Sequence, residues 1–260
     1  MNNYRVIVLD LDGTLLNANK EVSKRNLAAV LSCHRRGMRI VFATARPPRA
    51  VKWFLPDVLL EIASFVYYNG AQTYCPHTNT EFHESIPSEV TAAITDYCLE
   101  HHPDLELTME VRDEWFSLRE HDYRVTMNAE ANPLVIPLDE FKQRDATKIL
   151  LSGTFEGTPL QDTFSDRVHI LNTDNNQLVQ VMPLNASKEQ AVLKLCRIYG
   201  HEMESVIAFG DDHNDLGLAR ACGYSVAMGN AIDELKAIAD EVTASNDEDG
   251  VAVVLERLLS

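Results

Sequence analysis

The stretch VIVLDLDGTLL, residues 6–16, begins as an apolar run and then places Asp10 and Asp12 before a glycine. Residues 6–9 are β-branched or aliphatic, which predicts a strand covered on both faces that ends at Gly13. For the dipeptide Asp12–Gly13 alone, a surface turn is the simpler interpretation. Two carboxylates directly after a buried run are costly, however, unless a cation or hydrogen bonds compensate them. The carboxyl ends of parallel strands are also where α/β sheets bind ligands, so a ligand site is expected here.

The composition is that of a soluble globular protein, with 260 residues, 45% apolar and 24% charged. A formal net charge of -16 argues against a surface that binds nucleic acid or an anionic membrane. The five cysteines are scattered and include no CxxC pair, so neither a disulfide framework nor a zinc site is indicated. No signal peptide or membrane span stands out, and a cytoplasmic location is expected.

Strands and helices alternate at both ends of the chain, which predicts an α/β fold with a doubly wound, Rossmann-like parallel sheet. A helix capped by Ser23 is expected after the first strand, followed by a strand ending at Thr44 and a helix over residues 47–60. A hairpin turn is predicted at Asn69–Gly70. Between residues 84 and 183 alternating stretches and short helices predict an inserted α+β domain. The catalytic core then comprises residues 1–83 and 184–260.

A second acidic cluster follows another apolar strand in VIAFGDDHNDLGLA, residues 206–219. It contains Asp211, Asp212 and Asp215, together with Asn214. The simpler interpretation is that Asn214 caps a helix and Asp212 is a solvated turn residue. Two acidic strand ends in one parallel sheet can instead converge into an oxygen-rich site of the kind that Mg²⁺ prefers.

Four short motifs carry a family resemblance that spans nearly the whole chain. In order they are DLDGTL at 10–15, ATAR at 43–46, SKEQA at 187–191 and GDDHND at 210–215. Their order and their places at strand ends and helix starts resemble the haloacid dehalogenase-like phosphatases. The position of the insertion resembles the Cof-type branch of that family. The resemblance implies an α/β cap that covers the active site, and activity on phosphorylated sugars and other small phosphate esters.

The resemblance also implies roles for the aspartates. Asp10 would be the nucleophile that forms an aspartyl-phosphate, and Asp12 the general acid and base. Asp211 would bind Mg²⁺ together with Asp10 and the backbone carbonyl of Asp12. Asp215 would support the site from behind by positioning metal-bound water or Lys188.

Further residues of the motifs are implied to hold the transferring phosphoryl group. These are Thr44, Lys188 and Asn214, which offer a hydroxyl, an ammonium charge and an amide. From its own segment alone, Lys188 has the simpler interpretation of an ordinary exposed lysine. Arg46 and Asn69 lie at carboxyl ends of core strands and are expected to face the substrate.

The expected function is therefore a Mg²⁺-dependent phosphatase that hydrolyses small phosphate monoesters, with a phosphorylated metabolite as its partner. A phosphomutase that uses the same nucleophile is the first alternative. A non-catalytic module resembling a receiver domain is the second. Asp12 and an insertion of roughly a hundred residues argue against that module, because a receiver is a single domain of ordinary size.

Overall fold

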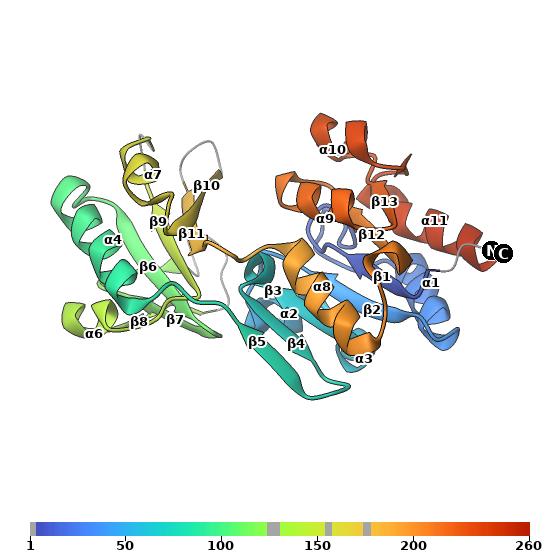
Figure 1. The fold of residues 1–260 in the computed structure, drawn as a ribbon, viewed down its shortest axis with the longest axis horizontal. Coiled ribbons are helices and arrows are strands. Elements are labelled where there is room, and N and C mark those ends of the chain that lie inside the picture. Colours follow the sequence, from blue (N-terminus) through green and yellow to red (C-terminus); the bar gives the residue numbers. More distant parts are fainter. Residues whose placement is uncertain (1–3, 124–130, 154–157, 174–177) are drawn as a thin grey trace. The chain divides into compact units, whose positions relative to one another are not determined.

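The computed structural model describes residues 4–123, 131–153, 158–173 and 178–260 (Figure 1). The chain divides into two compact units. The core unit comprises Met1–Phe82 and Ser187–Ser260, and the inserted unit comprises His83–Ala186. Within the described ranges, no helix is both long enough and apolar enough to cross a bilayer.

The core unit is built on one sheet, which has eight strands among the described residues, in the order β14-β13-β12-β1-β2-β3-β4-β5. The strands are β1 (Val6–Leu9), β2 (Arg39–Ala43), β3 (Ala63–Tyr67), β4 (Gln72–Cys75), β5 (Thr80–His83), β12 (Val206–Gly210), β13 (Tyr224–Ala227) and β14 (Glu241–Val242). β1 pairs in parallel with both β2 and β12, so that Leu9 lies between Phe42 and Phe209. The residues that follow these three strands therefore share one edge of the sheet.

Helices cover the sheet, as a doubly wound fold requires. They are α1 (Lys24–Arg35), α2 (Pro48–Phe54), α3 (Asp57–Ile62), α8 (Lys188–Tyr199), α9 (Leu216–Ala221), α10 (Asp233–Ile238) and α11 (Gly250–Leu259). Val6 and Val8 of β1 belong to one buried cluster with Val192 and Leu195 of α8. The predicted α/β class with a parallel core sheet is confirmed.

Local chemistry explains the limits of α1, α2 and α3. Ser23 caps α1 as predicted, and its hydroxyl accepts a hydrogen bond from the Asn26 N–H at 3.0 Å. The single helix predicted over residues 47–60 is wrong, because the chain forms α2 and α3 instead. Leu55 is extended ahead of Pro56, as a residue before proline prefers, and this breaks the helix. At the predicted hairpin turn, Asn69 has a φ of 53° inside a short 3-10 turn, η1 (Tyr68–Gly70), between β3 and β4.

The inserted unit has its own sheet and core. Its described strands are β6 (Glu106–Val111), β7 (Glu114–Ser117), β8 (Leu134–Val135), β9 (Lys148–Ser152), β10 (Val168–Thr173) and β11 (Leu178–Pro183). The helices are α4 (Ser88–His101), α6 (Leu138–Lys142) and α7 (Thr158–Phe164). The described strand pairs are antiparallel except β7 with β8. Leu107 and Met109 are buried in one core with Ile94 of α4, because alternate residues of β6 face the helices.

Candidate active site

The carboxyl edge of the core sheet gathers polar residues from three neighbouring parallel strands. Asp10 follows β1, Thr44 follows β2 and Asp211 follows β12. A cavity of about 280 Å³ opens there. Its lining residues are Asp10, Asp12, Gly13, Thr44, Ala45, Asp211, Asp212 and Asn214. Three of the four sequence motifs thus meet at one hollow, where strand-end loops of α/β sheets bind ligands.

Lys188, from the remaining motif SKEQA, joins two of the carboxylates. Its Nζ lies 2.7 Å from Asp10 Oδ1 and 2.7 Å from Asp215 Oδ1. Its side chain is buried, so the interpretation as an ordinary exposed lysine is wrong. Burial alone would lower the pKa of Lys188, but the two carboxylates outweigh it and raise that pKa, so the ammonium keeps its charge.

A close approach between α8 and η1 brings Lys188 into this position. Ser187 caps α8, with its side chain accepting from the Gln190 N–H at 3.3 Å. A Cβ on Gly70 would lie 2.3 Å from the Ser187 carbonyl oxygen, and Gly70 has a φ of +109°. Both the spacing and the backbone conformation therefore require glycine at this position.

Asp215 is held by the turn that follows β12. Its Oδ2 accepts from the N–H groups of Asp211 at 3.0 Å and Asp212 at 3.2 Å. Asp212 caps the short 3-10 turn η4 (His213–Asp215) through the His213 N–H. The capping role that the simpler interpretation gave to Asn214 therefore belongs to Asp212, because the cap must precede the turn.

The acidic cluster, of which Asp10 and Asp215 are buried and Asp211 is partly buried, has the chemistry of a magnesium site. Asp10, Asp211 and Asp215 each offer a carboxylate oxygen within 4.8 Å of the others. Burial raises the pKa of Asp10 well above its usual range despite Lys188. Burial also raises the pKa of Asp211 to about 6, although the Thr14 hydroxyl donates to it at 2.8 Å. Three carboxylates that share one ammonium leave excess negative charge, and hard oxygen donors of this kind suit Mg²⁺.

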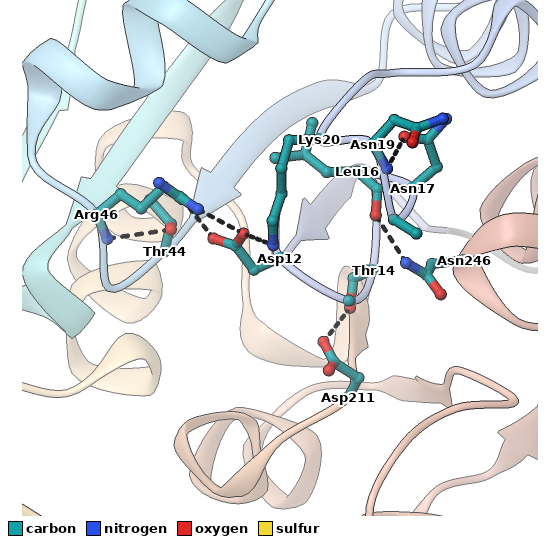
Figure 2. A network of polar contacts seen from close by, with 12 residues as sticks. Asp12, Thr14, Leu16, Asn17, Asn19, Lys20, Thr44, Arg46, Asp211 and Asn246 are labelled. Atoms are coloured by element: carbon teal, nitrogen blue, oxygen red, sulfur yellow. Dashed lines mark hydrogen bonds and ion pairs between the residues drawn. The ribbon is translucent and has the colours of Figure 1, made fainter. Parts of the chain in front are cut away.

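The carboxylate of Asp12 has a different environment, shown in Figure 2. Arg46 donates to it through Nε at 2.5 Å and Nη2 at 2.7 Å, and Lys20 Nζ lies 2.7 Å away. Burial alone would raise the pKa of Asp12, but the hydrogen bonds from these two cations outweigh it and lower that pKa. Arg46 therefore reaches this edge of the site, with its guanidinium on Asp12. Lys20 was missed by the sequence reasoning, because its exposed turn carries no catalytic signature.

The remaining candidates lie beside the cavity. The Asn214 amide donates to Asn69 Oδ1 at 3.0 Å, while Asn214 Oδ1 is buried without a hydrogen-bond partner among the described residues. The Thr44 hydroxyl accepts from the Arg46 N–H at 3.2 Å. Asn69 is itself buried, and its N–H donates to the Thr44 carbonyl oxygen at 2.9 Å. A buried polar atom without a partner is unusual, since such atoms are normally satisfied.

Comparison with known proteins shows which family this chain resembles. The family model described as haloacid dehalogenase-like hydrolase matches residues 7–255. The chain is 30% identical to the 5-amino-6-(5-phospho-D-ribitylamino)uracil phosphatase YitU of Bacillus subtilis, covering 98% of this chain and 97% of that protein. It is 29% identical to the pyridoxal phosphate phosphatase YbhA of Escherichia coli, covering 95% of this chain and 96% of that protein.

Solved structures agree with this assignment. The crystal structure of TM0651 from Thermotoga maritima superposes with a TM-score of 0.87 at 30% identity, covering 98% of this chain and 97% of that one. A haloacid dehalogenase-like hydrolase from Bacteroides thetaiotaomicron gives 0.84 at 28% identity, with 98% and 99% coverage. The chain therefore belongs to the haloacid dehalogenase-like hydrolases, in their Cof-type branch, and is an enzyme of the phosphatase class.

Proposed function

We propose that this enzyme is a Mg²⁺-dependent phosphatase that hydrolyses small phosphate monoesters, with phosphorylated sugars as its expected substrates. The observation that carries the proposal is the buried cluster in which Asp10 and Asp215 share Lys188 beside Asp211. Such a cluster offers a nucleophilic carboxylate, a fixed positive charge and oxygen donors for a cation around one cavity.

In the proposed reaction the Asp10 carboxylate attacks the phosphorus of the ester. The bond between phosphorus and the ester oxygen breaks, an aspartyl-phosphate forms, and the leaving oxygen takes a proton from Asp12. Asp12 must therefore enter this step protonated, although Arg46 and Lys20 lower its pKa in the free enzyme. Asp12 then accepts a proton from water as that water attacks the aspartyl-phosphate. Inorganic phosphate leaves and the Asp10 carboxylate is regenerated, so one difficult displacement becomes two easier ones.

Mg²⁺ would be held by the carboxylates of Asp10 and Asp211 and by the backbone carbonyl of Asp12. Asp215 would support these ligands by holding Lys188 in place. When bound, the ion would supply positive charge for the phosphoryl oxygens and offset the crowded carboxylates. The raised pKa values of Asp10 and Asp211 support this assignment, because they report a site that resists further negative charge.

Lys188, Thr44 and Asn214 are proposed to surround the oxygens of the transferring phosphoryl group. Lys188 supports this role because it is already buried and charged against the nucleophile. Thr44 and Asn214 line the same cavity as Asp10. Preorganised donors of this kind are worth most where charge develops in a water-poor site. Arg46 and Asn69 remain proposed substrate contacts.

The substrate class is supported by the names of two relatives. YitU is named for a phosphoribitylamino-uracil and YbhA for pyridoxal phosphate, and both compounds are small phosphate monoesters. Because the relatives differ in substrate at similar identity, the ester used by this chain has to be found by experiment.

The test is to incubate the purified protein with a panel of phosphorylated metabolites, with Mg²⁺ or with excess chelator. Release of inorganic phosphate that requires Mg²⁺ supports the proposal. A phosphomutase would instead return the phosphoryl group to the substrate, so an isomerised sugar phosphate with little free phosphate would contradict hydrolysis. Phosphate release that survives exhaustive chelation would contradict the metal assignment.

A further inference from the structure

The turn between β1 and α1 presents a lysine in an unusual backbone conformation. Lys20 has a φ of 62°, in the left-handed region that residues other than glycine rarely adopt. Asn17 builds the turn around it. The Asn17 side-chain oxygen accepts from the N–H groups of Asn19 and Glu21 at 3.0 Å each, and the Asn17 carbonyl accepts from the Lys20 N–H at 2.9 Å. The backbone of Lys20 is thus fixed by its own turn.

A distant segment anchors the same turn. Asp247 accepts from the Ala18 N–H at 2.8 Å. The Asn246 amide donates to the Leu16 carbonyl at 2.9 Å, as Figure 2 shows. Both anchors belong to η5 (Asn246–Glu248), near the end of the chain. The turn is therefore held from outside as well as from within. Strain of this kind persists where surrounding structure enforces it, and it points to a functional role.

The lysine that this turn presents binds Asp12. Lys20 Nζ contacts Asp12 Oδ1 at 2.7 Å, on the oxygen that also accepts from Arg46 Nη2. Arg46 is supported separately, because its guanidinium lies 4.3 Å over the ring of Phe54. Asp12 is 34% exposed in its side chain, so it is not fixed by burial. Its orientation depends on two cations that reach it from different segments.

We propose that Lys20 is a positioning residue, which holds the Asp12 carboxylate where it can exchange a proton with the leaving-group oxygen. The inference rests on the proposed function, in which Asp12 is the general acid and base. Removing Lys20 would leave Asp12 held only by the two hydrogen bonds from Arg46, so the Asp12–Arg46 pair could shift together toward the space that Lys20 now fills. Proton transfer is sensitive to such loss of alignment, whereas attack by Asp10 on phosphorus is not.

Two esters separate these steps, because kcat/KM reports events up to formation of the aspartyl-phosphate. An alkyl phosphate, here the best sugar phosphate of the panel, needs a proton on its leaving oxygen, and p-nitrophenyl phosphate does not. Lys20→Ala should lower kcat/KM about tenfold for the sugar phosphate and less than about twofold for p-nitrophenyl phosphate. Lys20→Arg, which keeps a cationic donor, should recover most of the loss.

Lys20→Gly separates positioning from folding. Glycine adopts a φ of 62° without strain. The melting temperature of the Lys20→Gly variant should therefore equal or exceed that of the wild type. The selective loss on the sugar phosphate should nevertheless match that of Lys20→Ala. Lys24→Ala, at the exposed first residue of α1, removes the same charge nearby and should leave both activities unchanged.

Four outcomes would overturn the inference. Equal losses on both esters would place Lys20 on the transferring phosphoryl group, and unchanged activity would give it no role. A matching loss in Lys24→Ala would reduce the effect to net charge. A wild type that releases no phosphate from either ester would overturn the proposed function and this inference with it, whereas an active wild type with an unselective Lys20→Ala overturns the inference alone.

Discussion

Two ion clusters at the edge of the core sheet have opposite compositions. In the first, one ammonium, that of Lys188, lies between the carboxylates of Asp10 and Asp215, and all three side chains are buried. In the second, the carboxylate of Asp12 lies between Lys20 and Arg46, and the three side chains are 27–46% exposed. With Asp211, the first cluster carries excess negative charge, whereas the second carries excess positive charge.

The difference shows how one edge can accommodate two ligands of opposite sign. In the buried cluster the pKa values of Asp10 and Asp211 are raised, so a cation relieves it. The exposed cluster lowers the pKa of Asp12 and has positive charge to spare for an anion. A divalent cation and a phosphate ester therefore suit adjacent parts of one site. The following predictions alter one cluster and leave the other intact.

The largest effect is expected from Asp10→Asn. A neutral amide is a poor nucleophile and a weaker metal ligand, so turnover should fall more than about a thousandfold. The fold should be retained, as circular dichroism would show. Phosphate release near the wild-type rate would contradict the assignment of Asp10 as the nucleophile.

The free energy of unfolding should depend much more on Lys188 than on Lys20. Lys188→Met leaves Asp10 and Asp215 buried without their cation, which should cost about 3–5 kcal/mol. Lys20→Met breaks an exposed ion pair and should cost less than about 1 kcal/mol. Urea unfolding measures both, in a Trp115→Phe background so that Trp53 reports on the core unit alone. Similar costs for the two variants would contradict the contrast between the clusters.

Asp12→Ala should affect proton transfer and spare the nucleophile. Hydrolysis of a sugar phosphate should fall about a hundredfold or more, because its alkoxide leaving group needs a proton. The kcat/KM for p-nitrophenyl phosphate should fall much less. Equal losses on the two esters would remove Asp12 from the acid role while leaving Asp10 as the nucleophile.

The smallest effect concerns metal and pH. Mg²⁺ at about a hundredfold above its dissociation constant should stabilise the protein by roughly 2.7 kcal/mol, measured as a rise in melting temperature against a monovalent salt of matched ionic strength. Asp211→Asn should blunt this rise. Without metal, the same variant should be more stable than the wild type at pH 7 by roughly 1–2 kcal/mol, discounted because Asp211 is partly open to solvent.

The sign of the pH dependence follows from the raised pKa of Asp211, about 6. An aspartate in the unfolded chain titrates near about 3.9, so the folded protein binds this proton more tightly. Stability of the metal-free wild type, relative to Asp211→Asn, should therefore fall as the pH rises from about 4 to about 6 and level off above that. A relative stability that rises over this window would contradict the burial of Asp211 beside other carboxylates.

Much of the core could be predicted from the sequence because its signals are local and strong. The apolar runs before Asp10 and Asp211 define buried strands, and parallel pairing brings their ends together. Such patterns determine which residues approach the edge. They do not determine which pairs form there, and the contact between Asn69 and Asn214 depends on the backbone at η1.

The features that the sequence did not predict also have physical causes. Pro56 lies within an otherwise helical pattern, and the extended residue before it ended the helix early. β8 and β14, of two residues each, are too short to show alternation. Lys20 lies in a polar turn whose importance depends on the return of its side chain to Asp12, earlier in the same loop. Asp12 was identified from its motif, but nothing in the local sequence shows that Lys20 reaches it.

The central position of β1 has a consequence for how the enzyme is made. Its neighbour β2 follows at once, but β12 is synthesised much later, and Thr14 and Asp211 are 197 positions apart. Until β12 leaves the ribosome, one edge of β1 has no native partner, and open strand edges favour wrong pairings. The inserted unit, continuous over His83–Ala186, is complete before that point. The nascent chain is therefore expected to carry a folded insert beside half a sheet, and to depend on chaperones most while its last quarter is still being translated.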